Sequence, residues 1–487
     1  IPETGVSVAE LSRALRRWLG AQRTIEGSLR KTPDGQIKLE ARLAGHDPVS
    51  AIGAPAQIDD LERQVAEQLF TQLDAPNFAN YLSWTGRQSE ALALMAKLPG
   101  LAADDADRAN VVSLWANHVK DPVRSIALTQ MALAFDPKLA TPWFEVFVRE
   151  HQLGHDEASL AAARHLLATR EQDQIPEIRG VGFRDARKLA IDQIDGLTGD
   201  FEGQLGQRAR LTAADRTPAK MAPVFAGLHD GRSGRLLLAE AGDADSASPD
   251  LLSLRLYADM GADDWAGAAR DGAQLLDLQG QTWAKATTAD DRAGVLWRAL
   301  TRDRPRLAEA RMRIGDLAGA QTAIGPTPMD CYPCLGERGR IAAAARDWPG
   351  AQRWFAEAVR QGPSLPFAYA DWAQMLLARG DAPGAIAKLR LAHEKGPHWA
   401  DPLELWGEAL IRTGDLAGAA ASFAEADKHA PRWGLNHLLW GEALMLSGRY
   451  AEARAQYQAA NGLDLSGPDR AALNLLLART AAGPLHG

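Results

Sequence analysis

Cys331 and Cys334 are the only two cysteines in the 487 residues, and their Cys-x-x-Cys spacing is typical of several kinds of site. Such a pair can act as a dithiol redox couple, supply half of a zinc site, or serve as a structural pair closed as a disulfide. The chain has no second cysteine pair to complete a zinc site. Pro333 fits the first turn of a helix, where its missing N–H costs nothing, so we expect the pair at a helix start. Three interpretations of the pair therefore remain open: a structural pair, a disulfide and a redox couple.

The histidine-containing and glycine-rich stretches indicate no further chemistry. In HEKGPH, residues 393–398, the histidine spacing is wrong for a zinc-protease helix, and Gly396-Pro397 ends the helix. Neither a GxxxxGK[ST] phosphate loop nor a GxSxG nucleophile elbow occurs, and GRSGR at 231–235 is interpreted as a Gly/Ser/Arg turn. Most acidic residues fall at helix starts or on outer faces, where solvent and the helix dipole explain them. We therefore expect no catalytic residue, no metal and no cofactor.

The charge balance limits the classes of partner. There are 54 Lys and Arg against 62 Asp and Glu, which gives a net charge of −8. Nucleic-acid binding needs clustered basic residues, so this balance argues against it. No apolar run approaches the roughly 18 residues that span a bilayer. Helix-forming residues interrupted by regular glycines predict a mainly α protein.

A repeat of 34 residues organises the C-terminal third. Gly380, Gly414 and Gly448 are 34 residues apart, and GDLAGAQ at 315–321 recurs as GDLAGAA at 414–420. The same period relates Pro363, Pro397 and Pro431, and also Trp372, Trp406 and Trp440. The residues that fit one repeat are Leu335, Gly339, Ala351, Phe355, Ala358 and Pro363, followed one repeat later by Leu403, Gly407, Ala419, Phe423, Ala426 and Pro431. This pattern resembles tetratricopeptide repeats (TPR), which implies an α-solenoid of helix hairpins.

The period also occurs upstream, with an interruption. Gly86, Lys120 and Gly154 are again 34 apart, a further unit surrounds Gly261, and one with a shortened second helix surrounds Gly315. Residues 171–250 lose the period and are interpreted as divergent repeats or as a joint. The expected domains are a small α/β module (1–75), a first TPR array (76–170), the divergent repeats or joint (171–250), TPR-like repeats (251–330) and a regular TPR array (331–487).

The N-terminal segment has a different pattern. An apolar stripe predicts a helix over 7–20, two strands flank a Pro-Asp-Gly turn, and a third strand is expected near 48–54. Asp59 and Asp60 are expected to cap the following helix. The stretches Gly27-Ser28-Leu29-Arg30, PDGQIKLEARL and DDLERQVAEQL resemble the TolB-like module of bacterial membrane-linked signalling proteins.

That resemblance carries implications for location. It implies a bacterial protein anchored in the inner membrane, with this soluble part on the periplasmic side, where a disulfide at 331–334 could persist. The chain opens IPETGVS without a methionine, so we expect it to be a fragment or mature portion, and any signal or anchor has been removed or lies upstream.

The TPR resemblance also implies where a partner would bind, because the first helix of each hairpin lines a concave groove. The tryptophans at 372, 406 and 440 precede the small residue of the helix crossing and are expected in the core, so that Trp406→Ala would cost about 3–5 kcal/mol. The groove positions counted from them are Arg340, Phe367, Ala370, Gln374, Leu377, Asp401, Glu404, Glu408, Ile411, Leu435, Leu438, Glu442 and Met445. This mixed apolar and acidic face favours a partner segment with apolar anchors and positive charge.

The leading hypothesis is a non-enzymatic scaffold that binds a protein or peptide in this groove. One alternative is a sensory or assembly module of a membrane-anchored signalling protein. Another is a thiol-redox or folding-associated protein acting through Cys331 and Cys334. An unoccupied, solvated groove face is also open, since acidic side chains on a helix surface need no ligand.

Overall fold

The computed structural model describes residues 25–174, 181–209, 217–240 and 248–481. The helix expected over 7–20 lies outside these residues. The chain divides into two compact units, one ending at His118 and the other beginning at Val119, and each is described by itself. None of the described helices has the length and apolar character needed to span a membrane.

The described residues of the first unit form a three-stranded antiparallel sheet followed by helices, as the strand pattern predicts. Its strands are β1 (Ile25–Lys31), β2 (Ile37–Leu43) and β3 (Val49–Gly53), in the order β1-β2-β3. Ile25 pairs with Leu43, and the Pro-Asp-Gly segment turns between β1 and β2. The alternation of side chains brings β2 and β3 residues to one face, where they form a core with the following helix.

That helix, α2 (Ile58–Trp84), packs Leu61, Val65 and Leu69 against β2 and β3. Asp59 and Asp60 lie in its first turn, but the N-cap is Gln57 without a side-chain cap, so the predicted carboxylate cap is wrong. A kink at Asp74 divides α2. The unit is completed by the short helices η1 (Pro55–Gln57) and η2 (Leu98–Gly100) and by α3 (Gln88–Met95) and α4 (Asp105–His118).

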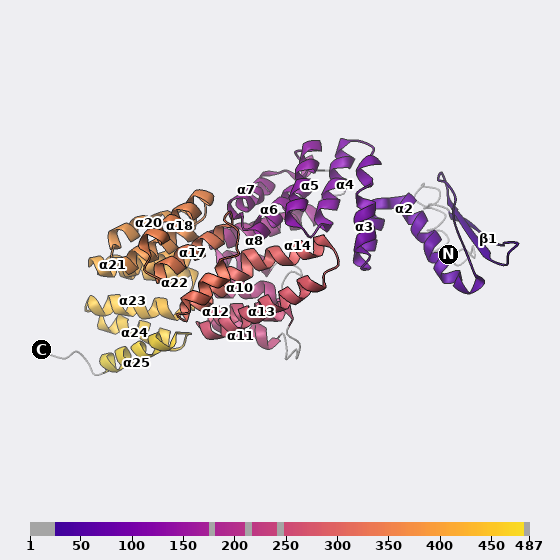
Figure 1. Ribbon diagram of the computed structural model, residues 1–487. Coiled ribbons are helices and arrows are strands. Elements are labelled where there is room, and N and C mark those ends of the chain that lie inside the picture. Colours follow the sequence, from indigo (N-terminus) through magenta and orange to yellow (C-terminus); the bar gives the residue numbers. More distant parts are fainter. Residues whose placement is uncertain (1–24, 175–180, 210–216, 241–247, 482–487) are drawn as a thin grey trace, which may run out of the picture. The chain divides into compact units, whose positions relative to one another are not determined.

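The second unit is helical throughout its described residues. Its first helices are α5 (Pro122–Phe135), α6 (Ala140–Leu153), α7 (Asp156–Ala168), the 3-10 turn η3 (Glu171–Asp173), α8 (Val181–Thr198), α9 (Phe201–Arg208), α10 (Pro218–Gly227) and α11 (Gly231–Glu240). They are followed by α12 (Pro249–Gly261), α13 (Trp265–Lys285), α14 (Ala289–Arg298), the π-helical segment η5 (Ala299–Asp303), α15 (Arg304–Arg313) and the short α16 (Leu317–Ile324). The pairs α6–α7, α12–α13 and α15–α16 pack as helix hairpins, whereas α14, η5 and α15 follow one another as one continuous helical stretch (Figure 1).

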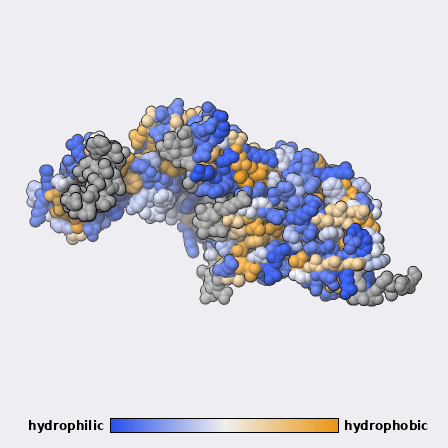
Figure 2. All heavy atoms as spheres, turned by 180° about the vertical axis from the view of Figure 1, so that it is seen from behind, coloured by the Kyte–Doolittle hydropathy of each residue, from blue (hydrophilic) through white to orange (hydrophobic). Residues whose placement is uncertain are grey.

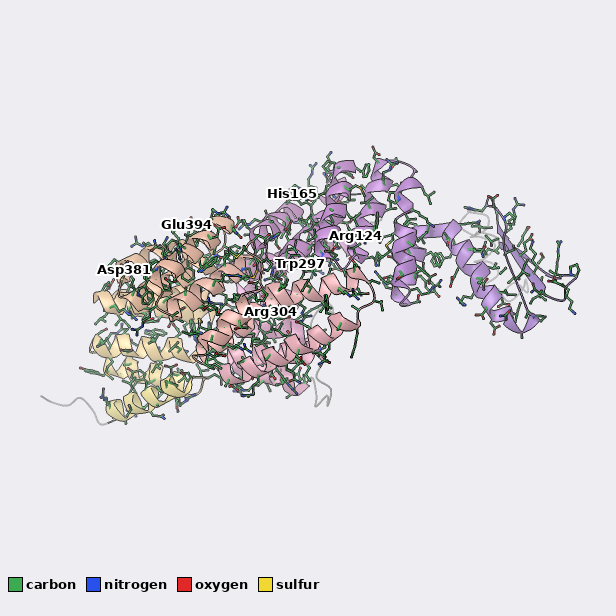
Figure 3. All side chains as sticks on the ribbon, in the orientation of Figure 1. Arg124, His165, Trp297, Arg304, Asp381 and Glu394 are labelled. Atoms are coloured by element: carbon green, nitrogen blue, oxygen red, sulfur yellow. A yellow bond between two sulfur atoms is a disulfide. The ribbon has the colours of Figure 1, made fainter. Side chains whose placement is uncertain are left out.

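The C-terminal hairpins repeat the 34-residue period. They are α17 (Tyr332–Ala344) with α18 (Trp348–Gln361), α19 (Phe367–Arg379) with α20 (Ala382–Lys395), α21 (Ala400–Thr413) with α22 (Leu416–His429), and α23 (Gly434–Leu446) with α24 (Tyr450–Asn461). The last helix, α25 (Gly467–Ala481), packs on α24. Asp381, where α20 starts, and Glu394, near its end, are labelled in Figure 3. The chain therefore has the TPR-like fold that the period predicts.

The turns inside several hairpins share one local arrangement. Gly380 adopts a left-handed backbone (φ 89°), a conformation that glycine allows without steric cost. The carboxylate of Asp381 then accepts a hydrogen bond from the backbone N–H of Gly384 at 2.9 Å and so caps α20. The equivalent caps are Asp316 to Gly319, Asp347 to Gly350 and Asp415 to Gly418. A short sequence pattern thus specifies these reversals of direction, whereas the α23–α24 turn has Arg449 at the N-cap and no side-chain cap.

The tryptophans are placed differently from the prediction. Trp372, Trp406 and Trp440 pack against core clusters, but each is only half-buried. The outer side is approached by basic residues: the Lys388 ammonium lies 3.5 Å from the Trp372 ring centroid, and the Arg390 guanidinium lies 5.9 Å from that of Trp406. The fully buried aromatics at this layer are Phe355, Phe423 and Tyr457 of the second helices.

The α6–α7 and α8–α11 region packs sideways against the C-terminal hairpins. The backbone N–H of Tyr332 donates to the carbonyl of Gly154, in the α6–α7 turn, at 2.8 Å. His398 contacts Asp200 of the α8–α9 turn at 2.8 Å, and the His229 ring, from the α10–α11 turn, stacks on Trp433 with centroids 3.8 Å apart. Residues far apart in sequence are therefore neighbours within the second unit.

Candidate functional site

Cys331 and Cys334 form a disulfide at the start of α17, with 5.2 Å between their Cα atoms. Pro333 occupies the first turn of this helix, as predicted. Both cysteines are fully buried in a cluster with Leu307 and Ile341. Among the described residues, no group of three or more His, Cys, Asp or Glu side chains could hold a metal ion. A buried disulfide holds a helix start in place and is not presented to a substrate.

Arg340 is held in an ionic network with three acidic side chains. Its guanidinium donates to Glu337 through Nε at 2.8 Å, and it lies 3.3 Å from Glu309 and 3.8 Å from Asp371. Burial raises the pKa of Asp371 to about 6 although Arg340 opposes the shift, and burial also raises the pKa of Glu337. Arg340 is thus engaged inside the protein and has little capacity left for a partner.

Asp401, Glu404 and Glu408 lie along one side of α21, as their spacing predicts. Glu404 is only 4% exposed, and it forms no ion pair with any of the described residues. Burial raises its pKa well above the ordinary value, and the nearby Glu408, Asp401 and Asp469 carboxylates raise it further. Asp401 contacts His229 at 3.1 Å. The chain's own α10–α11 turn and the start of α25 therefore lie beside this part of the predicted groove.

The structure divides the predicted groove into a covered part and an open part. Phe367 and Ala370 pack with Trp399 and Phe201, the latter from α9. Leu377 and Leu438 are buried, at 3% and 5% exposure, so their side chains have almost no surface for a ligand. Leu435 packs against two core clusters, and Ile411 packs against a third. Arg340, Phe367, Asp401 and Leu435 are half-buried, and each contacts other side chains of the chain. Among the remaining positions, Gln374 and Glu442 are exposed, and Glu408, Ile411 and Met445 are half-buried.

We call the set Gln374, Glu408, Ile411, Glu442 and Met445 the open strip. Gln374, Glu408 and Glu442 hold the same position in α19, α21 and α23, one repeat apart. Glu408 pairs with Arg412, whereas Glu442 forms no ion pair with any part of the chain that the structure describes. Leu446, at the end of α23, is 56% exposed. The open strip thus carries acidic groups beside apolar side chains.

Two further hollows lie outside the predicted site. One, of about 430 Å³, lies among α20, α21 and α22 and is lined by Trp406, Leu410, Ile386 and Glu425. The other, of about 170 Å³, is lined by Arg232, Arg235, Arg432 and Arg470 together with Asp230 and Asp464. The sequence signal for the second is the GRSGR stretch, whose two arginines line it. On the face drawn in Figure 2, hydrophobic patches are bordered by hydrophilic residues.

Comparison with known proteins finds similarity to solved structures of helical repeat proteins. No protein-family model matches the chain, and no curated protein does either. The structure of yeast Tom70 is 12% identical over 84% of this chain and 95% of that chain, with a TM-score of 0.36. The Cut9–Hcn1 hetero-tetramer of APC/C is 12% identical over 88% of this chain and 82% of that chain, with a TM-score of 0.47. A TPR protein of Thermus thermophilus is 18% identical over 37% of this chain and 99% of that chain, with a TM-score of 0.33.

Proposed function

We propose that this chain is a non-enzymatic scaffold that binds a protein or peptide segment along the open strip. The observation that supports this proposal is the repetition of one accessible position in three successive hairpins, at Gln374, Glu408 and Glu442. Accessible groups at a constant spacing suit an extended segment, because each hairpin can contact the next part of it.

The charge of the open strip defines the kind of segment. Glu442 has no ionic partner in the described part of the chain, and Met445 and Leu446 provide apolar surface beside it. A partner with a Lys or Arg beside an apolar residue would match both features. Because the acidic groups are accessible, the electrostatic part of binding should weaken as salt rises.

A binding measurement with the full chain tests this proposal. The probe is a labelled peptide of alternating Lys and Leu, with a Glu/Leu peptide for comparison, followed by fluorescence anisotropy. We expect the basic peptide to bind and the acidic one to fail. Glu408→Lys combined with Glu442→Lys should weaken binding at least about tenfold, a loss of about 1.4 kcal/mol.

The control is Glu452→Lys on α24, a glutamate whose side chain is 58% exposed on a second helix. It changes the net charge in the same direction without touching the open strip. Equal weakening by the control and the double variant would mean that overall charge governs binding, and the open strip would be rejected as the site.

A second candidate function concerns the N-terminal unit. Ile25 and Leu29 lie on the core-facing side of the sheet, opposite Leu43 and Leu39, yet each is 57% exposed because α2 covers β2 and β3. An apolar strand face of this kind supports the sensory or assembly alternative, in which a TolB-like module contacts another domain. Ile25→Lys with Leu29→Lys should then abolish that assembly while leaving peptide binding at the open strip intact.

We propose a periplasmic, inner-membrane-anchored location in a bacterium on the sequence resemblance described above. Trapping thiols by alkylation in intact cells of the native source, before lysis, tests it. An oxidised Cys331–Cys334 pair would support an oxidising compartment, and two alkylated cysteines would contradict it. The thiol-redox alternative gains no support from the geometry, because both sulfur atoms are buried.

A further inference from the structure

The arginine-lined hollow is formed by three segments that are distant in sequence. Arg232 and Arg235 come from α11, one turn apart on the same helix face. Arg432 precedes α23, and Arg470 lies in the first turns of α25, beside the 461–464 loop. The α10–α11 turn is held there because the His229 ring stacks on Trp433.

The two aspartates of this hollow are already engaged. The Asp230 carboxylate accepts hydrogen bonds from the Ser233 backbone N–H at 3.0 Å and the Ser233 hydroxyl at 2.6 Å, and it lies 3.4 Å from Arg432. The Asp464 carboxylate accepts from Arg235 at 2.8 Å. Each aspartate thus neutralises one arginine.

The other two arginines have no carboxylate partner among the residues that the structure describes. Arg470 donates from Nη1 to the backbone carbonyl of Asn461 at 3.0 Å and from Nη2 to that of Leu463. These carbonyls orient the guanidinium but do not cancel its charge. Arg232 is exposed, and it forms no ion pair with any residue that the structure describes. Within the described parts of the chain, two positive charges therefore lie around one hollow without a counterion.

Size and donor geometry identify a ligand class. The volume is about 170 Å³, and water occupies about 30 Å³ per molecule in the liquid, so a tetrahedral oxyanion fits with some water. Guanidinium groups form paired hydrogen bonds to phosphate oxygens, and a dianion would match the two uncompensated charges. We propose that this hollow binds a phosphate group, either as free phosphate or as a phosphate monoester. The site is separate from the open strip and does not depend on the scaffold function.

The test uses the full chain and isothermal titration at constant ionic strength. Inorganic phosphate and O-phosphoserine are titrated separately, and sodium acetate and sodium chloride provide comparisons. We expect saturable binding of at least one phosphate compound and none of acetate or chloride. Tighter binding of phosphoserine would identify a monoester as the ligand, and tighter binding of inorganic phosphate would identify the free ion.

Arg232→Gln is the decisive variant, because Arg232 has no ionic partner to lose among the residues described by the structure. It should weaken phosphate binding at least about tenfold, as should Arg470→Gln. Arg449→Gln, at an exposed arginine that pairs with Glu452 outside the hollow, is the matched control and should leave the affinity unchanged. If Arg470→Gln impairs folding, Arg232→Gln still decides the question. Absence of saturable binding, or unchanged affinity in Arg232→Gln, would overturn the proposal.

Discussion

Gly407 of α21 lies directly against the ring of Phe423 in α22, so closely that a Cβ atom on Gly407 would stand 2.6 Å from the ring carbons. The same relationship joins Gly339 to Phe355 and Gly441 to Tyr457. In these three hairpins, a missing side chain on the first helix makes room for a fully buried aromatic on the second. This contact sets the distance at which the two helices cross.

Gly407→Ala should lower the free energy of unfolding by about 1–3 kcal/mol, because the added methyl group overpacks a full core. Urea unfolding measures the change. Combined with Phe423→Leu, the same substitution should cost less than the sum of the two single changes, since the smaller side chain leaves room for the methyl. Gly467→Ala is the control: a Cβ there meets no atom within 4 Å, and the change should stay within about 0.5 kcal/mol.

Arg302→Met should lower the free energy of unfolding by about 3–5 kcal/mol, because it leaves the Asp156 carboxylate buried without its main partner. Arg302 lies 2.9 Å from Asp156, which is 5% exposed and also contacts His151 at 2.8 Å. Burial acts to raise the pKa of Asp156, but Arg302 and His151 outweigh it and hold the pKa below its ordinary value. Removing Arg302 should therefore shift acid unfolding to higher pH.

The comparison for Arg302→Met is Arg360→Met, which breaks the accessible pair of Arg360 with Glu357. Solvent screens such an exposed pair, so this variant should unfold close to the wild-type urea concentration. If the two variants lose similar amounts of unfolding free energy, burial of Asp156 does not determine the loss of stability.

Asp195→Asn should reduce the dependence of stability on pH. Burial raises the pKa of Asp195 from 3.8 to about 7, and the nearby Asp200 and Asp192 carboxylates add to the shift while His398 opposes it. The native state therefore binds the proton more tightly than the unfolded state, and stability falls as pH rises from about 4 to about 7. At pH 8 the asparagine variant should be more stable, on the order of 1 kcal/mol, by urea unfolding across this pH range.

Asp185→Asn, in the same helix but paired with Lys188 on the surface, is the control for removing a carboxylate from this helix. An Asp195→Asn profile as steep as that of the wild type would contradict this account of the buried carboxylate.

Replacing both Cys331 and Cys334 by serine should lower the free energy of unfolding by about 2 kcal/mol. The closed loop is short, so the entropy that the disulfide removes from the unfolded chain is modest. In the native protein, a thiol reagent should label neither position, even with mild reductant, because both sulfur atoms are buried. Labelling of the folded chain without denaturant would show that the packing around the start of α17 opens readily.

The sequence by itself determined the local architecture. The 34-residue period predicts the hairpins from α17 to α24, and a Gly-Asp-x-x-Gly pattern specifies a reversal because glycine supplies the left-handed residue and aspartate the cap. The stretch Gly199-Asp200-Phe201-Glu202-Gly203 carries this pattern inside the segment that lost the period, and Asp200 caps α9 there. The β1–β2 hairpin could also be predicted from the sequence, because side-chain alternation and the Pro-Asp-Gly turn act over neighbouring residues.

Only the tertiary structure decided which surfaces stay accessible. A repeat motif predicts that Glu404 and Phe367 face a groove, but it cannot indicate that the α10–α11 turn, α9 and α25 of the same chain lie beside them. It likewise cannot bring Arg232 to Arg470, which are separated by more than two hundred residues. Such contacts depend on how the helical arrays pack side by side. That packing arises from apolar and charged faces distributed over the whole second unit, so a local sequence pattern cannot predict it.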